Sequence, residues 1–298
     1  MTVAIPAVRT AGRPTRGGRR LPLTWIGVVP FLGYVSLFLL LPTGIVVYGA
    51  FVGPDGFTLS KFSVLTEPNV VTGFINSLIV SVASALVGAI GGALLAYAIV
   101  TGNPNGAFRR FVTAACGVLA QFGGVTLAFA FIATIGTAGI VYLFLKDHGI
   151  DLYPNRVWLY TLPGVTLVYS YFQIPLMVLV FLPALDGIKP QWREATESLG
   201  GNGWHYWRYV AGPLLLPAFT GATLLLFANS FSAYATVAAL INQGGIVTPI
   251  QISNALTSEV GLHSAALAST LAFGMVVIVT CVMVGYSLLQ NRTAKWLQ

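Results

Sequence analysis

The sequence predicts an all-α membrane protein with six transmembrane helices. Of its 298 residues, 56% are hydrophobic and only 8% are charged, and the mean hydropathy is +0.82. Soluble globular proteins carry about 25% charged residues. The apolar residues fall into long runs, each of which exceeds the roughly 20 residues that a helix needs to cross a bilayer. The predicted spans cover residues 24–51, 76–101, 112–135, 159–185, 214–240 and 265–289.

The N-terminal region combines a basic tail with the first span. Residues 1–23 hold five arginines among glycine, proline and threonine and show no apolar periodicity. The following apolar run is too long for a signal peptide and has no obvious small-residue cleavage site, so we expect it to be retained as a span. The membrane domain then covers residues 24–290, and residues 291–298 form a short C-terminal tail.

The second span has small residues at a regular spacing. Ser84, Gly88 and Gly92 recur every four residues, a pattern that lets transmembrane backbones approach closely. This spacing predicts close helix packing.

Basic residues fix the expected orientation. Six spans place both termini, the 102–111 turn and the 186–213 segment on one side of the membrane. That side holds twelve of the 15 Lys and Arg residues: Arg9, Arg13, Arg16, Arg19, Arg20, Arg109, Arg110, Lys189, Arg193, Arg208, Arg292 and Lys295. Cytoplasmic segments are enriched in Lys and Arg, so both termini and the 186–213 segment are predicted to be cytoplasmic. The net charge of +7 does not indicate nucleic-acid binding, because the basic residues do not cluster on a soluble face.

The polar 186–213 segment between spans 4 and 5 cannot lie inside a bilayer. Residues 191–199 read as a short helix with Pro190 at its first position. The Gly-Gly-Asn-Gly run at 200–203 ends that helix, because glycine adopts positive φ readily and disfavours helix continuation. A second helix follows, with Trp204, Trp207 and Ala211 on one face. We therefore expect two short amphipathic helices joined by a hinge.

These residues carry a resemblance to a known family. The segment contains Glu194-Ala195, Leu199-Gly200, Trp204, Val210 and the Pro-Leu-Leu-Leu-Pro run at 213–217. In its Glu, Gly and Pro spacing it resembles the EAA loop of inner-membrane permeases of binding-protein-dependent ABC importers, of type I with the MetI-like fold. It departs from that pattern at Thr196 and Gly201, where the family usually has Ala, and at Gly212, where it usually has Leu.

The resemblance implies a transport subunit rather than an enzyme. The loop would be the coupling helix that docks in a cleft of a separate ATPase, and its expected coupling residues are Glu194, Ala195, Leu199, Gly200, Trp204, Pro213 and Pro217. The chain has no G-x-x-x-x-G-K-[ST] phosphate loop, so ATP and Mg²⁺ are expected on the partner and no cofactor on this chain. Expected partners are two ATPase subunits, a second permease subunit (sister or self) and an extracytoplasmic binding protein, in the inner (cytoplasmic) membrane.

A different reading of the loop remains open. Trp192, Trp204 and Trp207 would also suit a helix pair that lies on the lipid headgroups. The motif spacing favours the coupling role.

The substrate path must be sought among uncharged polar residues, because the predicted spans hold no ionisable residue near their centres. The candidates are Gln121, Tyr169, Gln173, Asn229, Ser230 and Tyr234. Ser230 and Tyr234 are four residues apart and are expected to share a helix face, with Asn229 beside it. The alternative is that these residues form interhelical hydrogen bonds.

The expected substrate class is based on resemblance to particular groups of permeases within this family. Leu199 replaces the Asp that is common before the glycine in sugar permeases, and residues 227–236 are similar to polyamine-type permeases. The resemblance thus favours a polyamine such as spermidine or putrescine, or a related solute (aminoethylphosphonate, thiamine or ferric iron). A sugar or other small solute is the alternative. A passive channel or facilitator is the alternative from another class, but a charged ring or filter motif is not visible.

Cys116 and Cys281 lie in apolar segments and indicate neither a disulfide framework nor a metal site.

Overall fold

The computed structural model describes residues 24–53, 56–103, 106–241, 246–257 and 262–294. The expected tails at 1–23 and 295–298 lie outside these residues. The chain divides into two units, Met1–Val46 and Val47–Gln298. Its helices are α1 (Thr24–Val35), α2 (Leu41–Phe51), α3 (Pro68–Thr101), α4 (Ala107–Gln121), α5 (Gly124–Ile135), α6 (Ile140–Asp147), α7 (Leu162–Asp186), α8 (Pro190–Ser198), α9 (Gly203–Tyr206), α10 (Gly212–Ser232), α11 (Ala235–Leu240), α12 (Thr248–Thr257) and α13 (Leu262–Ala294).

Short elements join several of these helices. π-helical turns at Ser36–Leu40 and Trp207–Ala211 connect α1 to α2 and α9 to α10, and 3-10 turns lie at Ser60–Thr66 and Trp158–Tyr160. The strands β1 (Val52–Gly53) and β2 (Gly56–Phe57) form an antiparallel pair.

Six helical segments in the described part of the chain are long and apolar enough to cross a membrane. They are Val28–Phe51, Pro68–Thr101, Gly124–Asp147, Leu162–Asp186, Gly203–Ser232 and Leu267–Leu288. The predicted class, an all-α membrane protein with six spans, is therefore confirmed.

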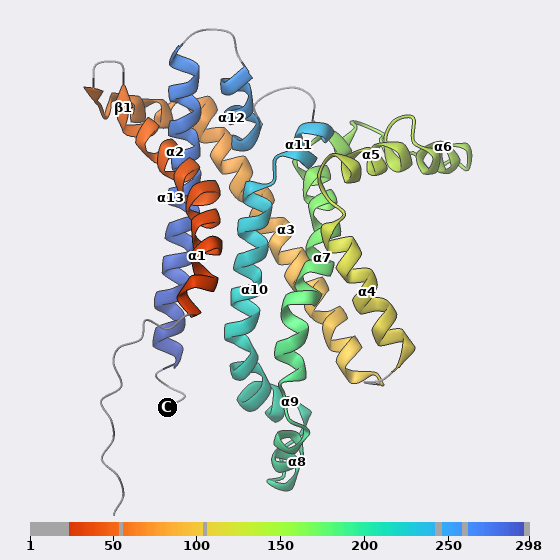
Figure 1. Cartoon of the computed structure of the whole chain (residues 1–298). Coiled ribbons are helices and arrows are strands. Elements are labelled where there is room, and N and C mark those ends of the chain that lie inside the picture. Colours follow the sequence, from red (N-terminus) through yellow and green to blue (C-terminus); the bar gives the residue numbers. More distant parts are fainter. Residues whose placement is uncertain (1–23, 54–55, 104–105, 242–245, 258–261, 295–298) are drawn as a thin grey trace, which may run out of the picture. The chain divides into compact units, whose positions relative to one another are not determined.

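The α3 helix is the axis on which the second unit is built. It runs along α7 and α10, and α4 packs on the other side of α7 (Figure 1). Ser84, Gly88 and Gly92 are all buried, and a Cβ added at Gly88 would lie 2.5 Å from Gln173 Cβ of α7. The two helices thus approach too closely for a side chain at this position, as the four-residue spacing predicts.

Three prolines lie inside the helices α7 and α10, which pack against α3. Pro175 and Pro183 lie within α7, and Pro217 lies within α10. Buried helices tolerate proline where neighbouring groups satisfy the freed backbone. Proline at 217 removes the N–H that would bond to the Pro213 carbonyl. The Pro217 carbonyl itself accepts hydrogen bonds from the Tyr286 hydroxyl of α13 at 2.7 Å and from Thr220 Oγ1 at 3.1 Å, and the first of these connects α10 to α13.

The prediction of one unbroken helix for the third span is wrong. Instead of one helix over residues 112–135, α4 ends at Gln121 and α5 begins at Gly124. Gly124 has φ +67°, a left-handed conformation that favours glycine and cannot continue an α-helix. After this break α5 packs against α11, whereas α4 packs against α7. The third segment that is long and apolar enough to cross a membrane is therefore Gly124–Asp147 instead of 112–135.

The fifth span also differs from the prediction of 214–240. The α10 helix ends at Ser232, and Ala233 has ψ 111°, outside the helical range. At this point the Tyr169 hydroxyl of α7 donates a 2.7 Å hydrogen bond to the Ala233 carbonyl. A tertiary contact therefore stabilises the helix end, and α11 begins separately at Ala235.

Two stretches outside the predicted spans are helical. The α3 helix begins at Pro68, eight residues before the predicted start at 76, with proline in its first turn. Between the fifth and sixth predicted spans, α12 packs against α13 and α3, and Asn76 Nδ2 of α3 donates to the Ile246 carbonyl at 2.9 Å.

The first unit consists of α1, the π turn and the start of α2. All but one of its large apolar side chains between Val28 and Ile45 are exposed, including Phe31, Phe38 and Leu39, and the exception, Val35, is half-buried. An apolar helix of this kind requires lipid or protein around it.

Candidate functional site

The polar segment after α7 forms a tight helix-turn-helix. α8 ends in a Schellman motif, in which the Gly201 N–H donates to the Thr196 carbonyl at 2.9 Å and the Gly200 N–H donates to the Glu197 carbonyl at 3.0 Å. Gly200 has φ +78°. Gly200 thus terminates the helix by its left-handed conformation, as the sequence predicts.

Asn202 starts the next helix through a reciprocal cap. Its Oδ1 accepts a hydrogen bond from the His205 N–H at 3.1 Å, and its own N–H donates to His205 Nδ1 at 3.3 Å. The expected second short helix is not a separate element, however. From Gly203 the helix continues through the π turn at Trp207–Ala211 into α10, so the helical segment is Gly203–Ser232. The break between the two helical parts of the loop therefore lies just before Gly203, and the second part is continuous with α10.

The tip of this loop exposes a mixed acidic and apolar surface. Leu199 and Trp204 are 89% and 68% exposed, and Glu194 and Ala195 are also exposed. Among the described residues, Glu194 forms no ion pair, whereas the neighbouring Glu197 accepts from Arg193 at 3.0 Å. Outside the membrane spans, apolar side chains this exposed are available for contact with a partner protein or with lipid headgroups. We call Glu194, Ala195, Leu199 and Trp204 the loop tip.

The two prolines at the end of the predicted motif have different positions. Pro213 is exposed at the start of α10, directly after the π turn, and has no N–H with which to continue the helical hydrogen bonding. Pro217 is half-buried inside α10. The structure therefore places Pro213 and Pro217 in α10, away from the loop tip.

Two contacts that sequence reasoning missed connect the loop to the spans. Arg109 Nη2 of α4 and Asp186 Oδ2 at the end of α7 form an ion pair at 2.5 Å. Tyr97 of α3 meets Trp207 edge to face, with ring centroids 5.4 Å apart. The sequence contained a signal for the Arg109–Asp186 ion pair. Both residues lie next to an end of a predicted span, and these two ends are predicted to lie on the same side of the membrane.

The two departures from the family pattern at Thr196 and Gly201 are sterically related. A Cβ added at Gly201 would lie 2.7 Å from Thr196 Cγ2, which is closer than two carbon atoms tolerate. Thr196 therefore occupies the space that an alanine at position 201 would need. Its hydroxyl also donates to the Trp192 carbonyl at 2.8 Å within α8.

Three of the six substrate-path candidates are buried and hydrogen-bonded between helices. Ser230 Oγ of α10 lies 2.7 Å from Ser84 Oγ of α3, and Gln173 Nε2 of α7 donates to the Leu226 carbonyl at 2.8 Å. Tyr169 makes the bond to Ala233 described above. These contacts agree with the packing interpretation. Gln173 Oε1 is buried and has no hydrogen-bond partner among the described residues.

The other three candidates reach the surface. Asn229 and Gln121 are exposed, and Tyr234 is exposed with its hydroxyl 2.8 Å from Ser253 Oγ of α12. The expectation that Ser230 and Tyr234 share a helix face is wrong, because α10 ends between them at Ser232. Asn229 is thus the candidate on α10 that is free to meet a solute.

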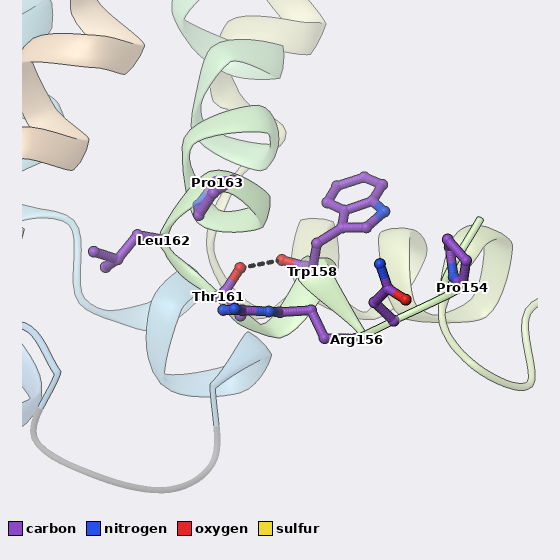
Figure 2. A pocket seen from close by; sticks show the side chains of 7 residues that line it. Pro154, Arg156, Trp158, Thr161, Leu162 and Pro163 are labelled. Atoms are coloured by element: carbon purple, nitrogen blue, oxygen red, sulfur yellow. Dashed lines mark hydrogen bonds between the residues drawn. The ribbon is translucent and has the colours of Figure 1, made fainter.

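A separate pocket lies in the segment that leads into α7, which the charge rule assigns to the extracytoplasmic side. Its volume is about 600 Å³, and Arg156 and Asn155 contribute its polar atoms together with Thr161. Figure 2 shows Leu162 and Pro163 on the first turn of α7, with Thr161 donating to the Trp158 carbonyl at 2.6 Å. Trp158 Nε1 donates in turn to the Leu152 carbonyl at 2.9 Å, which fixes the loop.

Comparisons with known proteins agree on the family. The family profile described as "Binding-protein-dependent transport system inner membrane component" matches residues 140–295. The inner membrane ABC transporter permease protein YdcU of Escherichia coli (strain K12) is 26% identical over 225 residues, which cover 69% of this chain and 68% of that protein. The sulfate transport system permease protein CysT of Salmonella typhimurium is 25% identical over 229 residues, covering 74% and 75%.

Thiamine permeases match over a shorter region. The thiamine transport system permease protein ThiP of Escherichia coli (strain K12) is 30% identical over 138 residues, 46% of this chain. The matched segments span only 24% of that protein and 15% of its Salmonella typhimurium counterpart.

A solved structure has the same fold. A chain of the crystal structure of a bacterial ABC transporter involved in the import of alginate superposes with a TM-score of 0.71 at 19% identity, covering 91% of this chain and 95% of that one. Since the family profile covers more than half of the 298 residues, the chain belongs to the family of inner-membrane permease subunits of binding-protein-dependent ABC importers, with the MetI-like fold.

Proposed function

We propose that this subunit carries a small solute into the cytoplasm by ATP-driven alternating access. Family members are transport subunits rather than enzymes, so ATP hydrolysis takes place on two separate ATPase subunits. The observation that carries the proposal is the loop tip. It presents the Glu194 carboxylate, which forms no ion pair with any described residue, and two exposed apolar side chains next to a glycine-stabilised turn. On this proposal the loop is an EAA loop and α8 is its coupling helix.

The connections of the loop support transmission of force. Because the loop continues through the π turn into α10, movement of an ATPase bound to its tip would shift α10 directly. The Arg109–Asp186 ion pair and the Tyr97–Trp207 contact link the same region to α4, α7 and α3. A conformational change at the cytoplasmic face thereby reaches the helices that pack around α3, including the exposed Asn229 on α10.

The partners follow from the same reasoning. A second permease subunit, identical or related, completes the pore, because six helices in one chain enclose a path poorly. An extracytoplasmic binding protein docks on the external segments, where the Arg156 pocket offers a concave basic surface. A crystal structure of the alginate transporter with an oligosaccharide-bound periplasmic protein aligns with a TM-score of 0.72, which fits this arrangement. The loop tip then faces the cytoplasm, as do both termini.

The substrate belongs, on this proposal, to the polyamine, phosphonate, iron and thiamine group. The absence of Asp before Gly200 supports this group, and similarity to thiamine permeases favours including thiamine beside spermidine and putrescine. Sulfate and oligosaccharides enter the test panel because related chains carry those names.

The test is the ATPase activity of the purified complex in lipid, with its binding protein loaded from that panel. Stimulation by one loaded ligand supports the importer and names the substrate. Gly200→Pro and Glu194→Lys should each abolish uptake while the complex still inserts, because they remove the turn and reverse the charge of the loop tip. Normal uptake in both variants would refute the coupling role. Passive flux without an associated ATPase would refute the importer.

A further inference from the structure

Two cavities adjoin where the spans meet the coupling loop. The first is an apolar groove of about 510 Å³ between α3, α7 and α10, lined for example by Leu94, Phe181 and Leu216. The second has a volume of about 380 Å³ and lies between the ends of α3 and α7 and the loop. Its lining includes Thr101, Arg193, Gly203 and Tyr206. Tyr97, Leu185 and Trp207 line both cavities, so the two adjoin at these side chains.

We infer that these cavities form a binding site for one anionic phospholipid. An acyl chain occupies the apolar groove, and the phosphate occupies the second cavity against the Arg193 guanidinium and the Tyr206 hydroxyl. Basic pockets next to transmembrane helices on the cytoplasmic side are a recurrent form of lipid headgroup site.

The arrangement of polarity carries this assignment. The groove lies along three membrane-spanning helices, and every side chain at its deep end is apolar. The cation and hydroxyl groups lie at the opposite end, where α8 and α9 leave the spans. A small polar solute would leave the groove unoccupied, and a soluble partner could not reach it. An amphiphile with a long apolar chain and a negatively charged head matches both cavities.

Aromatic side chains mark the boundary between the two cavities. Trp207 meets Tyr97 with ring centroids 5.4 Å apart and Tyr206 with centroids 6.0 Å apart. Trp and Tyr concentrate at the membrane–water interface, where one end of the ring is apolar and the other is hydrated. These three rings therefore place the junction of the cavities at the level of the lipid headgroups.

Arg193 is available to a phosphate despite its ion pair. Its partner Glu197 lies one turn later on α8, and both side chains are more than half exposed. Exposed ion pairs contribute little to stability, so a phosphate competes readily for the guanidinium. Arginine can bind phosphate through two parallel N–H donors, whereas the contact of Arg193 with Glu197 is a single one, from Nε at 3.0 Å.

The headgroup, rather than the chain, sets the selectivity. Lipid tails are as apolar as the groove, so transfer of an acyl chain from the bilayer provides little driving force by itself. A single cation near the membrane surface changes the affinity for an anionic lipid about fivefold. The site is thus selective for negative charge, and its occupancy would hold the loop against α3 and α7. The inference does not depend on whether the loop docks an ATPase.

The experiment is native mass spectrometry of the purified complex, after incorporation in nanodiscs that contain equal amounts of phosphatidylcholine and phosphatidylglycerol. The wild type should retain phosphatidylglycerol preferentially. Arg193→Gln should reduce that preference about fivefold, whereas Arg208→Gln, an exposed arginine of the same loop that does not line the cavity, should leave it unchanged.

A second pair of variants tests the groove. Leu216→Trp fills it and should reduce retention of both lipids, whereas Leu225→Trp, another exposed leucine of α10 that does not line the groove, should not. Equal retention of the two lipids by the wild type would overturn the inference, as would unchanged selectivity in Arg193→Gln. If Leu216→Trp separates the permease subunits and leaves lipid retention intact, a second subunit covers the groove and the lipid site is refuted.

Discussion

Replacement of Gly92 by alanine tests the close contact between α3 and α7. An added Cβ would lie 2.6 Å from the Ile174 carbonyl oxygen and 2.8 Å from Met177 Cγ, so backbone as well as side chain must move. The adjacent Gly91 is the matched control, since its added Cβ would meet only the end of the Ile174 side chain, at 3.3 Å.

The expected magnitude follows from these contacts. Alanine is favoured over glycine inside a helix by about 0.5–1 kcal/mol, and this gain is common to both variants. Overpacking of a well-packed contact costs about 1–3 kcal/mol, and only Gly92→Ala incurs it. We therefore expect Gly92→Ala to be about 1–3 kcal/mol less stable than Gly91→Ala.

The measurement is thermal unfolding of both variants in the same detergent. At about 2–4 °C per kcal/mol, the melting temperature of Gly92→Ala should be lower than that of Gly91→Ala by at least a few degrees. Equal melting temperatures would show that α3 and α7 are not in close contact at Gly92, and the reasoning from the four-residue spacing would fail.

Three further predictions concern the loop and the path. Gly201→Ala should increase proteolytic cleavage in the loop and lower uptake, because the added Cβ would lie 2.7 Å from Thr196 Cγ2 and 2.9 Å from the Thr196 carbonyl oxygen. Adding Thr196→Ala removes the nearer of these two atoms and should restore part of both properties; no rescue would contradict the steric relation. Gly200→Ala should destabilise the turn by about 1–2 kcal/mol, whereas Gly203→Ala, with open space and no positive φ, should not, as loop proteolysis would report. Asn229→Leu should change the uptake kinetics, and unchanged kinetics would assign Asn229 to lipid or packing.

Much of the fold could be predicted because the responsible signals are local. Apolar length identifies five of the spans, Pro190 and Gly200 fix the limits of α8, and the small residues of α3 report its packing face. The distribution of Lys and Arg also predicts which side of the membrane each loop faces. These features depend on hydropathy, backbone conformation and spacing, which the sequence contains directly.

The breaks in the third and fifth predicted spans were missed for two different reasons. The Gly123-Gly124 pair was a visible local signal, but its effect was masked by the apolar residues on both sides. The end of α10 at Ser232 had no local signal, because Ala233 and Tyr234 are compatible with a helix. A hydrogen bond from Tyr169, 64 residues away in the sequence, stabilises that break. Tertiary contacts of this kind decide helix ends that propensity leaves open.

The exposure of the loop residues could be predicted from the sequence, whereas the exposure of the substrate-path candidates could not. Glu194, Leu199 and Trp204 are exposed together, as a docking surface requires. Among the path candidates, polarity alone could not separate Asn229, which is exposed, from Ser230, which is buried against Ser84. Adjacent residues on a helix face directions about 100° apart, and only the positions of neighbouring helices determine which one is buried.

Site-specific photo-cross-linking from Leu199 tests the central claim most directly. A photoreactive residue at this position, which is 89% exposed at the loop tip, should form a covalent adduct with an ATPase subunit in the assembled complex. The same residue at Leu256, which is exposed on α12 on the predicted external side, should form none with the ATPase. An ATPase adduct from Leu256 but not from Leu199 would contradict both the coupling role of the loop and the proposed orientation.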